Sequence, residues 1–287
     1  MTQPKRLLPD HTFTLGEGPS WDERTGKLYW VDIRAPSLHC LHLESGAHEC
    51  WEWPEVISCT GLAESGEILV GGVSGIWAFD PQTSRKKIRF PIPRLDEGVR
   101  TNDGKVGPDD SFWLSTMQDS DDRGPVGKLM RIGADGDVRV MLEGITTANG
   151  LEFSLDGGTL YLSDTRELWI DAWDYDAKHR TLTNRRRFAV LGEGEGKPDG
   201  AALDQTGAYW VAGIYSGQVH RFSPNGDRLG AQTLPAKMLT MPCFGGSDLK
   251  TLFVTSLSPG KALNCQDGGL FSIRVEVAGL RPRRMKI

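Results

Sequence analysis

The sequence predicts an all-β fold, a six-bladed β-propeller with four antiparallel strands in each blade and a ring closed by the N- and C-terminal segments. The first observation is a glycine-led motif that recurs with a period of about 45 residues, which is typical of a four-stranded propeller blade. The second is that no amphipathic helix longer than about two turns can be recognised. The third is the spacing of the motif glycines, Gly18, Gly61, Gly104, Gly150, Gly200 and Gly245, which follow one another at 43, 43, 46, 50 and 45 residues.

Each copy of the motif supplies the strands of one blade in order. The inner strands begin at EGPSWD, TGLAES, DGKVGP, NGLEFS, DGAALD and FGGSDL. Second strands rich in aromatic and β-branched residues follow: LYWVDI, EILVGG, FWLSTM, LYLSDT, YWVAGI and LFVTSL. Third strands follow in every copy, and most copies add a more polar fourth strand, such as AHECWEW or RKKIRFPI. Turn-prone segments such as ERTGK, DPQTS and SPNGD separate the strands.

The blades are expected to stabilise one another, because a single four-stranded sheet cannot bury both of its faces. Most of the nine tryptophans are therefore interpreted as core residues between blades. The segments Lys5–Thr14 and Leu280–Ile287 are expected to pair into the sixth blade and so close the ring. No Pro/Ser-rich or charge-rich stretch divides the chain, so residues 1–287 are expected to form a single propeller domain.

Composition excludes several classes of function. The formal net charge of −5 and the pI of about 5.7 give no electrostatic reason to expect binding to nucleic acid or to an anionic membrane. No window approaches the length of apolar sequence that spans a bilayer, and Met1–Asp10 does not resemble a signal peptide. The five cysteines lack CxxC spacing and are interpreted as reduced thiols of a cytoplasmic protein, with one disulfide left open.

The residue before each motif glycine is expected to lie at the same depth in the central channel in all six blades. An alternative is that Asn149 and Asp199 only form turns, because Asn and Asp before Gly are common there. Against it, these pairs begin inner strands, and Glu17 is not a favoured turn former. Oxygen ligands converging in a narrow channel predict one divalent cation, Ca²⁺, Mg²⁺, Mn²⁺, Zn²⁺ or Fe²⁺. The six residues of this register are Glu17, Thr60, Asp103, Asn149, Asp199 and Phe244.

Other motifs narrow the chemistry further. None of the six histidines occupies the register, so a histidine-based zinc site is not expected. The segment VRTNDGK places Arg100 and Asn102 at the mouth of the third blade, where they either belong to a solvated loop or hold oxygens of a polar ligand. The loop LGEGEGKPDG lacks the GK[ST] ending of a phosphate-binding loop, and neither GxSxG nor HExxH is present.

Five segments together resemble the senescence-marker-protein/gluconolactonase/regucalcin family over about Leu15 to Gly269. They are LGEGPSWDERTGKLYWVDI, VRTNDGKVGPDDSFWLSTM, ANGLEFSLDGGTLYLSDT, KPDGAALDQTGAYWVA and PCFGGSDLKTLFVTS. The resemblance implies a six-bladed propeller with one divalent ion in the channel, held by Glu17, Asn149 and Asp199. It also implies that Asp199 transfers the proton and that Arg100 and Asn102 contact substrate.

The resemblance raises two disagreements, one with the register of the channel residues and one with a residue type of this chain. In the third blade it points to Asn102 rather than Asp103, which is kept as a candidate for support behind the ligands. The family often has a substrate-contacting Glu after the STM-like strand, where this chain reads STMQDS and Asp119 is the nearest match. The shorter side chain leaves the sugar preference open.

The predicted function is hydrolysis of a small-molecule sugar lactone, with the metal polarising the carbonyl and Asp199 acting as general base. One alternative is a calcium-binding regulatory propeller without catalysis. Another is an esterase or organophosphatase of the paraoxonase type, although the sequence shows no ligand cluster for the second calcium that such proteins carry. The sugar, the native metal and the oligomeric state stay open.

Overall fold

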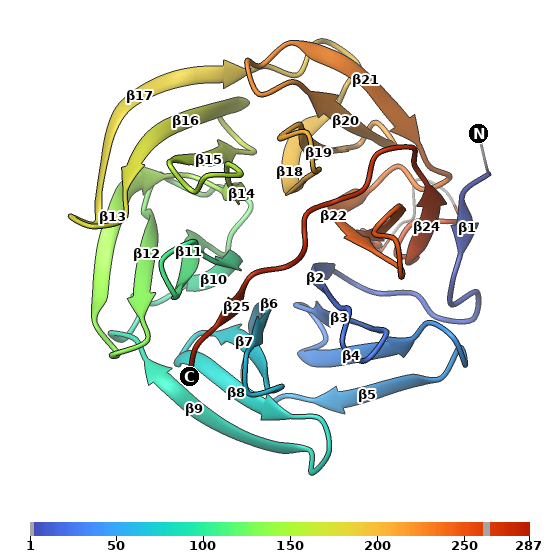
Figure 1. Cartoon of the computed structure of the whole chain (residues 1–287), viewed down its shortest axis with the longest axis horizontal. Coiled ribbons are helices and arrows are strands. Elements are labelled where there is room, and N and C mark those ends of the chain that lie inside the picture. The colour runs from blue at the N-terminus through green and yellow to red at the C-terminus, as the bar shows by residue number, and fades with distance from the viewer. Residues whose placement is uncertain (1–2, 261–264) are drawn as a thin grey trace.

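Six antiparallel β-sheets surround a central channel in the computed structural model, which describes residues 3–260 and 265–287 (Figure 1). Within these ranges there is no helix, and therefore none that could cross a membrane. Five sheets have four strands and one has five. The prediction of an all-β, six-bladed propeller with four antiparallel strands per blade is confirmed.

The strands of each blade follow one another outward from the channel in chain order. The first blade contains β2 (Gly16–Asp22), β3 (Lys27–Asp32), β4 (Ser37–His42) and β5 (His48–Glu52). The second contains β6 (Ile57–Ala63), β7 (Ile68–Gly72), β8 (Gly75–Asp80) and β9 (Arg85–Pro91), and the third contains β10 (Val99–Val106), β11 (Ser111–Gln118), β12 (Gly127–Gly133) and β13 (Val138–Ile145). The fourth contains β14 (Ala148–Phe153), β15 (Thr159–Asp164), β16 (Trp169–Asp176) and β17 (Thr181–Ala189), and the fifth contains β18 (Lys197–Leu203), β19 (Tyr209–Ile214), β20 (Gln218–Phe222) and β21 (Arg228–Thr233). The sixth contains β22 (Leu239–Gly245), β23 (Thr251–Ser256), β24 (Phe271–Arg274) and the N-terminal β1 (Lys5–Arg6).

The N-terminal segment closes the ring as predicted. β1 pairs antiparallel with β24, with Lys5 opposite Ser272 and Arg6 opposite Phe271, and is the outermost strand of the sixth blade. The first strand of the chain thus completes the last blade, which fixes the two ends of the repeat array to each other.

The expectation that the C-terminal segment also pairs into the sixth blade is wrong. This segment crosses the channel on the side facing the viewer in Figure 1, and β25 (Arg284–Met285) pairs in parallel with β6 of the second blade. β1, rather than the C-terminal segment, occupies the outer edge of β24. Met285 is fully buried in the apolar cluster between the second and third blades, which gives the segment its own reason to dock.

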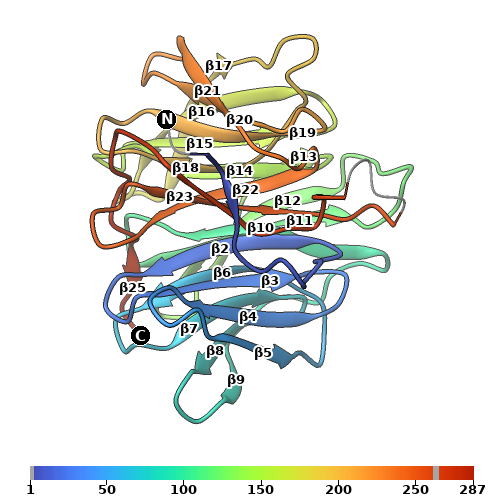
Figure 2. The ribbon, with the colours of Figure 1, turned by 90° about the vertical axis from the view of Figure 1, so that its right-hand side faces the viewer.

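Apolar side chains between neighbouring blades form the core. Figure 2 shows the sheets stacked on one another, seen from the side. Trp30 and Trp113 are fully buried, and Trp113 packs edge-on against Phe153 of the next blade with ring centroids 5.2 Å apart. The interpretation of most tryptophans as core residues is therefore confirmed.

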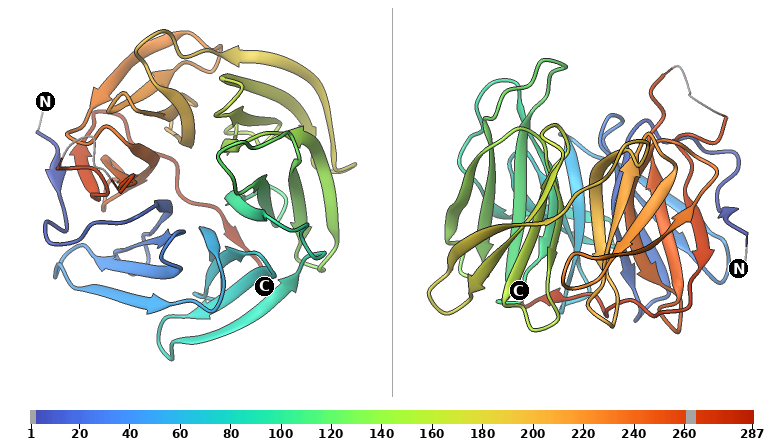
Figure 3. Two further views of the ribbon diagram at one scale, coloured as in Figure 1. Left: turned by 180° about the vertical axis from the view of Figure 1, so that it is seen from behind. Right: turned by 90° about the horizontal axis from the view of Figure 1, so that it is seen from above.

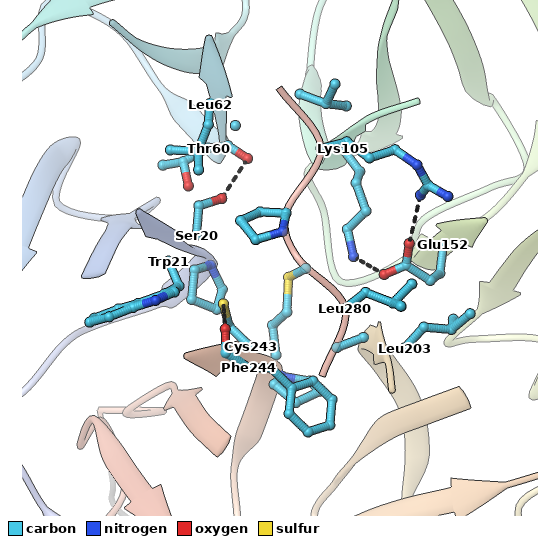
Figure 4. A pocket seen from close by; sticks show the side chains of 18 of the residues that line it. Ser20, Trp21, Thr60, Leu62, Lys105, Glu152, Leu203, Cys243, Phe244 and Leu280 are labelled. Atoms are coloured by element: carbon cyan, nitrogen blue, oxygen red, sulfur yellow. Dashed lines mark hydrogen bonds and ion pairs between the residues drawn. The ribbon is translucent and has the colours of Figure 1, made fainter. Parts of the chain in front are cut away.

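The C-terminal segment covers one end of the channel, which Figure 3 shows from behind and from above. At this end the close-up in Figure 4 shows Leu280 between Leu203 and the Lys105–Glu152 ion pair. The Leu280 N–H donates to the Leu203 carbonyl at 3.2 Å, and Arg283 donates to the Ser154 carbonyl at 3.0 Å. Only about 100 Å³ of space is left here, so the larger opening is at the opposite end.

Candidate functional site

A cavity of about 840 Å³ lies at the open end of the channel, and five of the six predicted site residues line it. Its wall is formed by the first residues of the inner strands and by the loops that join the second strand of a blade to the third. A volume of this order is typical of small-molecule sites. The five residues are Glu17, Arg100, Asn102, Asn149 and Asp199.

Irregularities in the inner strands position these side chains. The register between β2 and β3 shifts between Glu17 and Ser20, and that between β14 and β15 shifts between Asn149 and Glu152. The β18–β19 register shifts between Pro198 and Ala201, around Asp199. A β-bulge bends the strand and redirects a side chain, so each bulge can direct its polar residue into the channel rather than along the sheet.

The glycines after Glu17 and Asn149 permit this geometry. Gly18 and Gly150 have φ of 55° and 62°, in the left-handed region that residues with a Cβ avoid. A Cβ on Gly18 would lie 2.5 Å from the Cys59 Cα, so the neighbouring blade also excludes a side chain there. The motif glycines that revealed the repeat therefore have a direct role in shaping the site.

The expected equal depth of the six register positions is wrong for the second and sixth blades. Thr60 and Phe244 line the small cavity at the closed end, not the large one. Their strands shift register earlier, between Ile57 and Cys59 and between Leu239 and Pro242, so the residue before the glycine lies beyond the bulge and deeper in the channel.

In the third blade both candidate residues, Asn102 and Asp103, lie in the bulge between Thr101 and Gly104, but they have different surroundings. Asn102 lines the cavity, whereas Asp103 does not. The Asp103 carboxylate instead accepts a hydrogen bond from the Leu151 N–H at 2.9 Å, and its other oxygen is buried without a hydrogen-bond partner. Asn102 therefore has the cavity position that the family resemblance implied, and Asp103 lies behind it.

A chain of hydrogen bonds fixes the amides of the site. Arg100 donates to Asn102 Oδ1 at 2.8 Å, and Asn102 Nδ2 donates to Asn149 Oδ1 at 2.9 Å. Asn149 Nδ2 donates to Thr165 Oγ1 at 2.8 Å, and the Thr165 hydroxyl donates to the Pro198 carbonyl at 2.6 Å. The direction of donation fixes which end of the Asn149 amide carries the oxygen, and one lone pair of that oxygen is not used in the chain.

Burial raises the pKa values of three channel carboxylates, and the charge of another of the three adds to this at two of them. The pKa of Glu17 is raised by burial and by the charges of Asp199 and Asp103, which outweigh the Gly18 N–H and Arg100. The pKa of Asp199 is raised by burial and by Asp103, and that of Asp103 is raised by burial to about 6. At Glu17 and Asp199, burial and the neighbouring carboxylates together outweigh the opposing charge of Arg100, which indicates an excess of negative charge in the channel.

This donor set fits a divalent cation. Within residues 3–260 and 265–287 no three His, Cys, Asp or Glu side chains gather closely enough to hold a metal ion. The predicted set has two carboxylates, Glu17 and Asp199, and the carboxamide of Asn149 as its third member. Oxygen donors of this kind suit hard or borderline cations, and the neighbouring Asp103 adds negative charge without lining the cavity.

Asp119 is placed differently from the other predicted residues. It does not line the cavity, and its carboxylate accepts two hydrogen bonds from Arg34, at 2.7 and 2.8 Å. It also lies 3.2 Å from Arg100 Nε. These two arginines lower the pKa of Asp119, so it is ionised at neutral pH and neutralises charge behind the cavity wall.

The sequence reasoning missed several residues that line the cavity. Thr165 links Asn149 to the fifth blade, and Arg34, Arg123, Arg166 and Lys197 add positive charge to the wall. A signal for Arg34 and Arg166 exists in hindsight: each follows by two residues an Asp that ends the second strand of its blade.

The chain is similar to a known protein family, to named lactonases and to a solved structure. The profile of the SMP-30/Gluconolactonase/LRE-like region matches residues 15–258. A 6-deoxy-6-sulfogluconolactonase of Pseudomonas putida is 38% identical over 272 residues, 92% of each chain, and a pentonolactonase of Haloferax volcanii is 32% identical over 86% of this chain and 83% of its own. The crystal structure of a calcium-binding protein, regucalcin, from Agrobacterium tumefaciens superimposes with a TM-score of 0.90 at 27% identity, covering 98% of this chain and 97% of that one.

Proposed function

The chain belongs to the SMP-30/gluconolactonase/LRE-like family, and from that premise we propose that it is a divalent-metal-dependent lactonase that hydrolyses an aldonolactone to the aldonic acid. The observation that carries the proposal is the convergence of Glu17, Asn149 and Asp199 in one cavity beside Arg100. The names of the Pseudomonas and Haloferax relatives, both sugar lactonases, support a lactone as the substrate.

Hydrolysis requires a nucleophilic water, a place for its proton and stabilisation of charge on the carbonyl oxygen. The water oxygen forms a bond to the carbonyl carbon, and the bond from that carbon to the ring oxygen breaks. We assign to Asp199 the proton that the water loses, and its transfer to the ring oxygen as that oxygen leaves. Asp199 is suited to this role because it lines the cavity and is directed into it at a strand bulge.

A divalent cation held by Glu17, Asn149 and Asp199 would supply Lewis acidity toward the carbonyl oxygen. Arg100 and Asn102 are assigned to orientation of the sugar hydroxyls. The Arg100 side chain is fixed by Asn102 and Asp119 and lines the cavity, so it can hold a polar ligand without reorganising first. We assign Asp119 the role of positioning Arg100 rather than contacting the sugar.

A second candidate function is calcium binding without turnover, which the similarity to the calcium-binding regucalcin of Agrobacterium favours. The same oxygen donors would serve both functions. The two proposals differ in one outcome, because only the lactonase consumes a lactone in proportion to enzyme concentration.

The test is a panel of aldonolactones assayed at near-neutral pH, with and without exhaustive chelation, and with an aryl ester and an organophosphate as controls. Spontaneous lactone hydrolysis is subtracted in each case. The proposal expects metal-dependent turnover of at least one aldonolactone, restored when metal is returned. Turnover that survives chelation, or tight Ca²⁺ binding with no turnover of any lactone, would overturn it.

A further inference from the structure

Positive charge gathers on the wall of the cavity to a degree that the hydrolysis of a neutral sugar lactone does not require. Among the described lining residues the acids are the two proposed metal ligands, Glu17 and Asp199, and one other, Asp121. A divalent cation would offset the two ligands, so the remainder of the wall is strongly cationic. The cationic residues are Arg34, Arg100, Arg123, Arg166 and Lys197.

Part of this charge has no counter-ion among the residues that the structure describes. Arg34 and Arg100 share Asp119, with Arg34 forming a bidentate pair. Arg123 donates its Nε–H to the Ser120 carbonyl at 2.8 Å, and Arg166 donates to a backbone carbonyl of the same loop. Within the described ranges no carboxylate lies within 4.0 Å of Arg123, Arg166 or Lys197.

The unpaired cations are close enough to affect one another. Burial and the charge of Arg166 lower the pKa of Arg123, and they outweigh the opposing charges of Asp119 and Asp121. Like charges held together in a partly dry cavity repel one another unless an anion is bound between them. The wall therefore has the electrostatics of an anion site.

Two of the arginines, Arg34 and Arg166, are also held on ordered turns. The backbone N–H of Arg34 donates to the carboxylate of Asp32 at 3.1 Å, and that of Arg166 donates to Asp164 at 3.0 Å. These turns belong to the first and fourth blades, and Arg123 lies between β11 and β12 of the third. The cations approach one space from separate blades, and the anchored turns of Arg34 and Arg166 preorganise part of the wall for a ligand.

We propose that the natural substrate is an aldonolactone with a second, anionic group at the end of its carbon chain far from the lactone carbonyl, and that Arg123 and Arg166 bind this group with Lys197 nearby. The inference rests on the proposed function and names its substrate class. A guanidinium offers paired N–H donors to a carboxylate, a phosphate or a sulfonate, so the shared chemistry is a compact oxyanion.

The position of the cations separates this anion from the carboxylate that hydrolysis itself creates. Asp199 and Asn149 are 6% and 5% exposed, whereas Arg166 is on the exposed rim of the same cavity. The new carboxylate forms at the buried ligands. The anion bound at the rim is therefore a different group of the same molecule.

The test compares kcat/KM for glucono-lactone with that for its counterparts carrying a carboxylate, a phosphate or a sulfonate at C6. The wild-type enzyme should prefer at least one anionic lactone, and the ranking of the three identifies the group. In the double variant Arg123→Ala/Arg166→Ala this preference should fall roughly 10- to 100-fold, the usual weight of charge-assisted hydrogen bonds. Arg139→Ala, which removes one exposed arginine from β13 of the third blade, is the matched control and should keep the preference.

Equal losses for neutral and anionic lactones, or a wild-type preference for the neutral lactone, would overturn the proposal. Binding of the hydrolysed acids is measured separately by calorimetry with the metal-loaded protein. There the acid with two anionic groups should bind more tightly than gluconate, and the double variant should lose that difference. If no lactone is turned over, this binding result still decides the anion site, while the lactonase proposal alone fails.

Discussion

Some residues of the site present oxygen atoms to the cavity, and others fix the orientation of those residues. Glu17 and Asp199 direct carboxylates into the space, and Asn149 contributes an amide oxygen whose orientation is fixed by Asn102 on one side and Thr165 on the other. Asp103 acts from behind through its charge. This division predicts different consequences for substitutions that are adjacent in sequence or space.

Removing a ligand should weaken metal binding and activity together. Glu17→Gln removes one negative charge, and Asn149→Ala removes the amide oxygen, so each is expected to reduce Ca²⁺ affinity by about tenfold or more. Calorimetry measures the affinity, and lactone turnover is followed at the same metal concentrations. Thr12→Ala, at an exposed site outside the cavity, is the control. Wild-type affinity in both ligand variants would contradict the assignment.

Metal affinity should rise with pH between about 5.5 and 7.5. Asp103, with a pKa of about 6, takes up a proton toward the acidic end of this range, and the raised pKa values of Glu17 and Asp199 shift their proton uptake in the same direction. In the metal-free protein their repulsion costs stability as the pH rises through those pKa values, and a bound cation removes that cost.

Calorimetry in two buffers of different ionisation enthalpy measures the protons released on Ca²⁺ binding. Protons should be released near pH 6, and fewer should be released by Asp103→Asn. An affinity that is the same at pH 5.5 and 7.5 would show that the carboxylates are not coupled to the ion.

At the scale of elements, the site depends on bulged inner strands and on turns held by buried aspartates. The Asp164 carboxylate accepts hydrogen bonds from the Thr146 and Thr147 N–H groups before β14 and from Arg166 after β15. Asp32 does the same around β2 and β3. One side chain thus holds both the start of an inner strand and a loop of the cavity wall.

Asp164→Ala should destabilise the protein by about 2–4 kcal/mol, because it leaves the buried N–H groups of Thr146 and Thr147 without an acceptor. Denaturant unfolding gives the change in free energy of unfolding. Asp156→Ala, which removes an exposed aspartate from the β14–β15 turn of the same blade, should cost much less. Equal stability of the two variants would contradict the role given to Asp164.

The bulges also explain which cavity-lining residues the sequence could predict. The motif glycine marks a cavity-lining residue in the first, fourth and fifth blades, because there the polar residue stands at the start of the bulge or within it. In the second and sixth blades the bulge precedes the motif, so Thr60 and Phe244 lie at the closed end. No unique residue pattern identifies the position of a β-bulge, so the periodicity of the sequence alone could not locate it.

At the scale of the whole molecule, the glycine period was sufficient to predict the number of blades, and the N-terminal strand was predicted in its correct place. The place of the C-terminal segment was not predicted, because the sequence of a short strand does not indicate which strand it pairs with. Its docking depends on Met285 entering a cluster from the second and third blades, and that is a tertiary contact. The cationic wall was missed for the same reason, since its arginines are distant in sequence and meet only in the ring.

The C-terminal segment should contribute to stability although it lies at the far end from the site. Met285→Ala is expected to lower the free energy of unfolding by about 2–5 kcal/mol, the usual cost of truncating a buried methionine. Ile287→Ala, which truncates a partly buried residue of the same segment, is the control and should cost less. A Met285→Ala protein as stable as wild type would show that docking of the segment does not contribute to the free energy of unfolding.

The most direct test of the central claim, that the channel carboxylates perform hydrolysis rather than only bind an ion, is the turnover of Asp199→Asn at saturating metal. Asn retains the size and one oxygen donor but not the basicity. With metal occupancy confirmed by calorimetry and spontaneous hydrolysis subtracted, kcat should fall roughly 10²- to 10⁴-fold, the usual contribution of a positioned base. Turnover within about threefold of wild type at full occupancy would contradict the account and assign the proton transfer to another group.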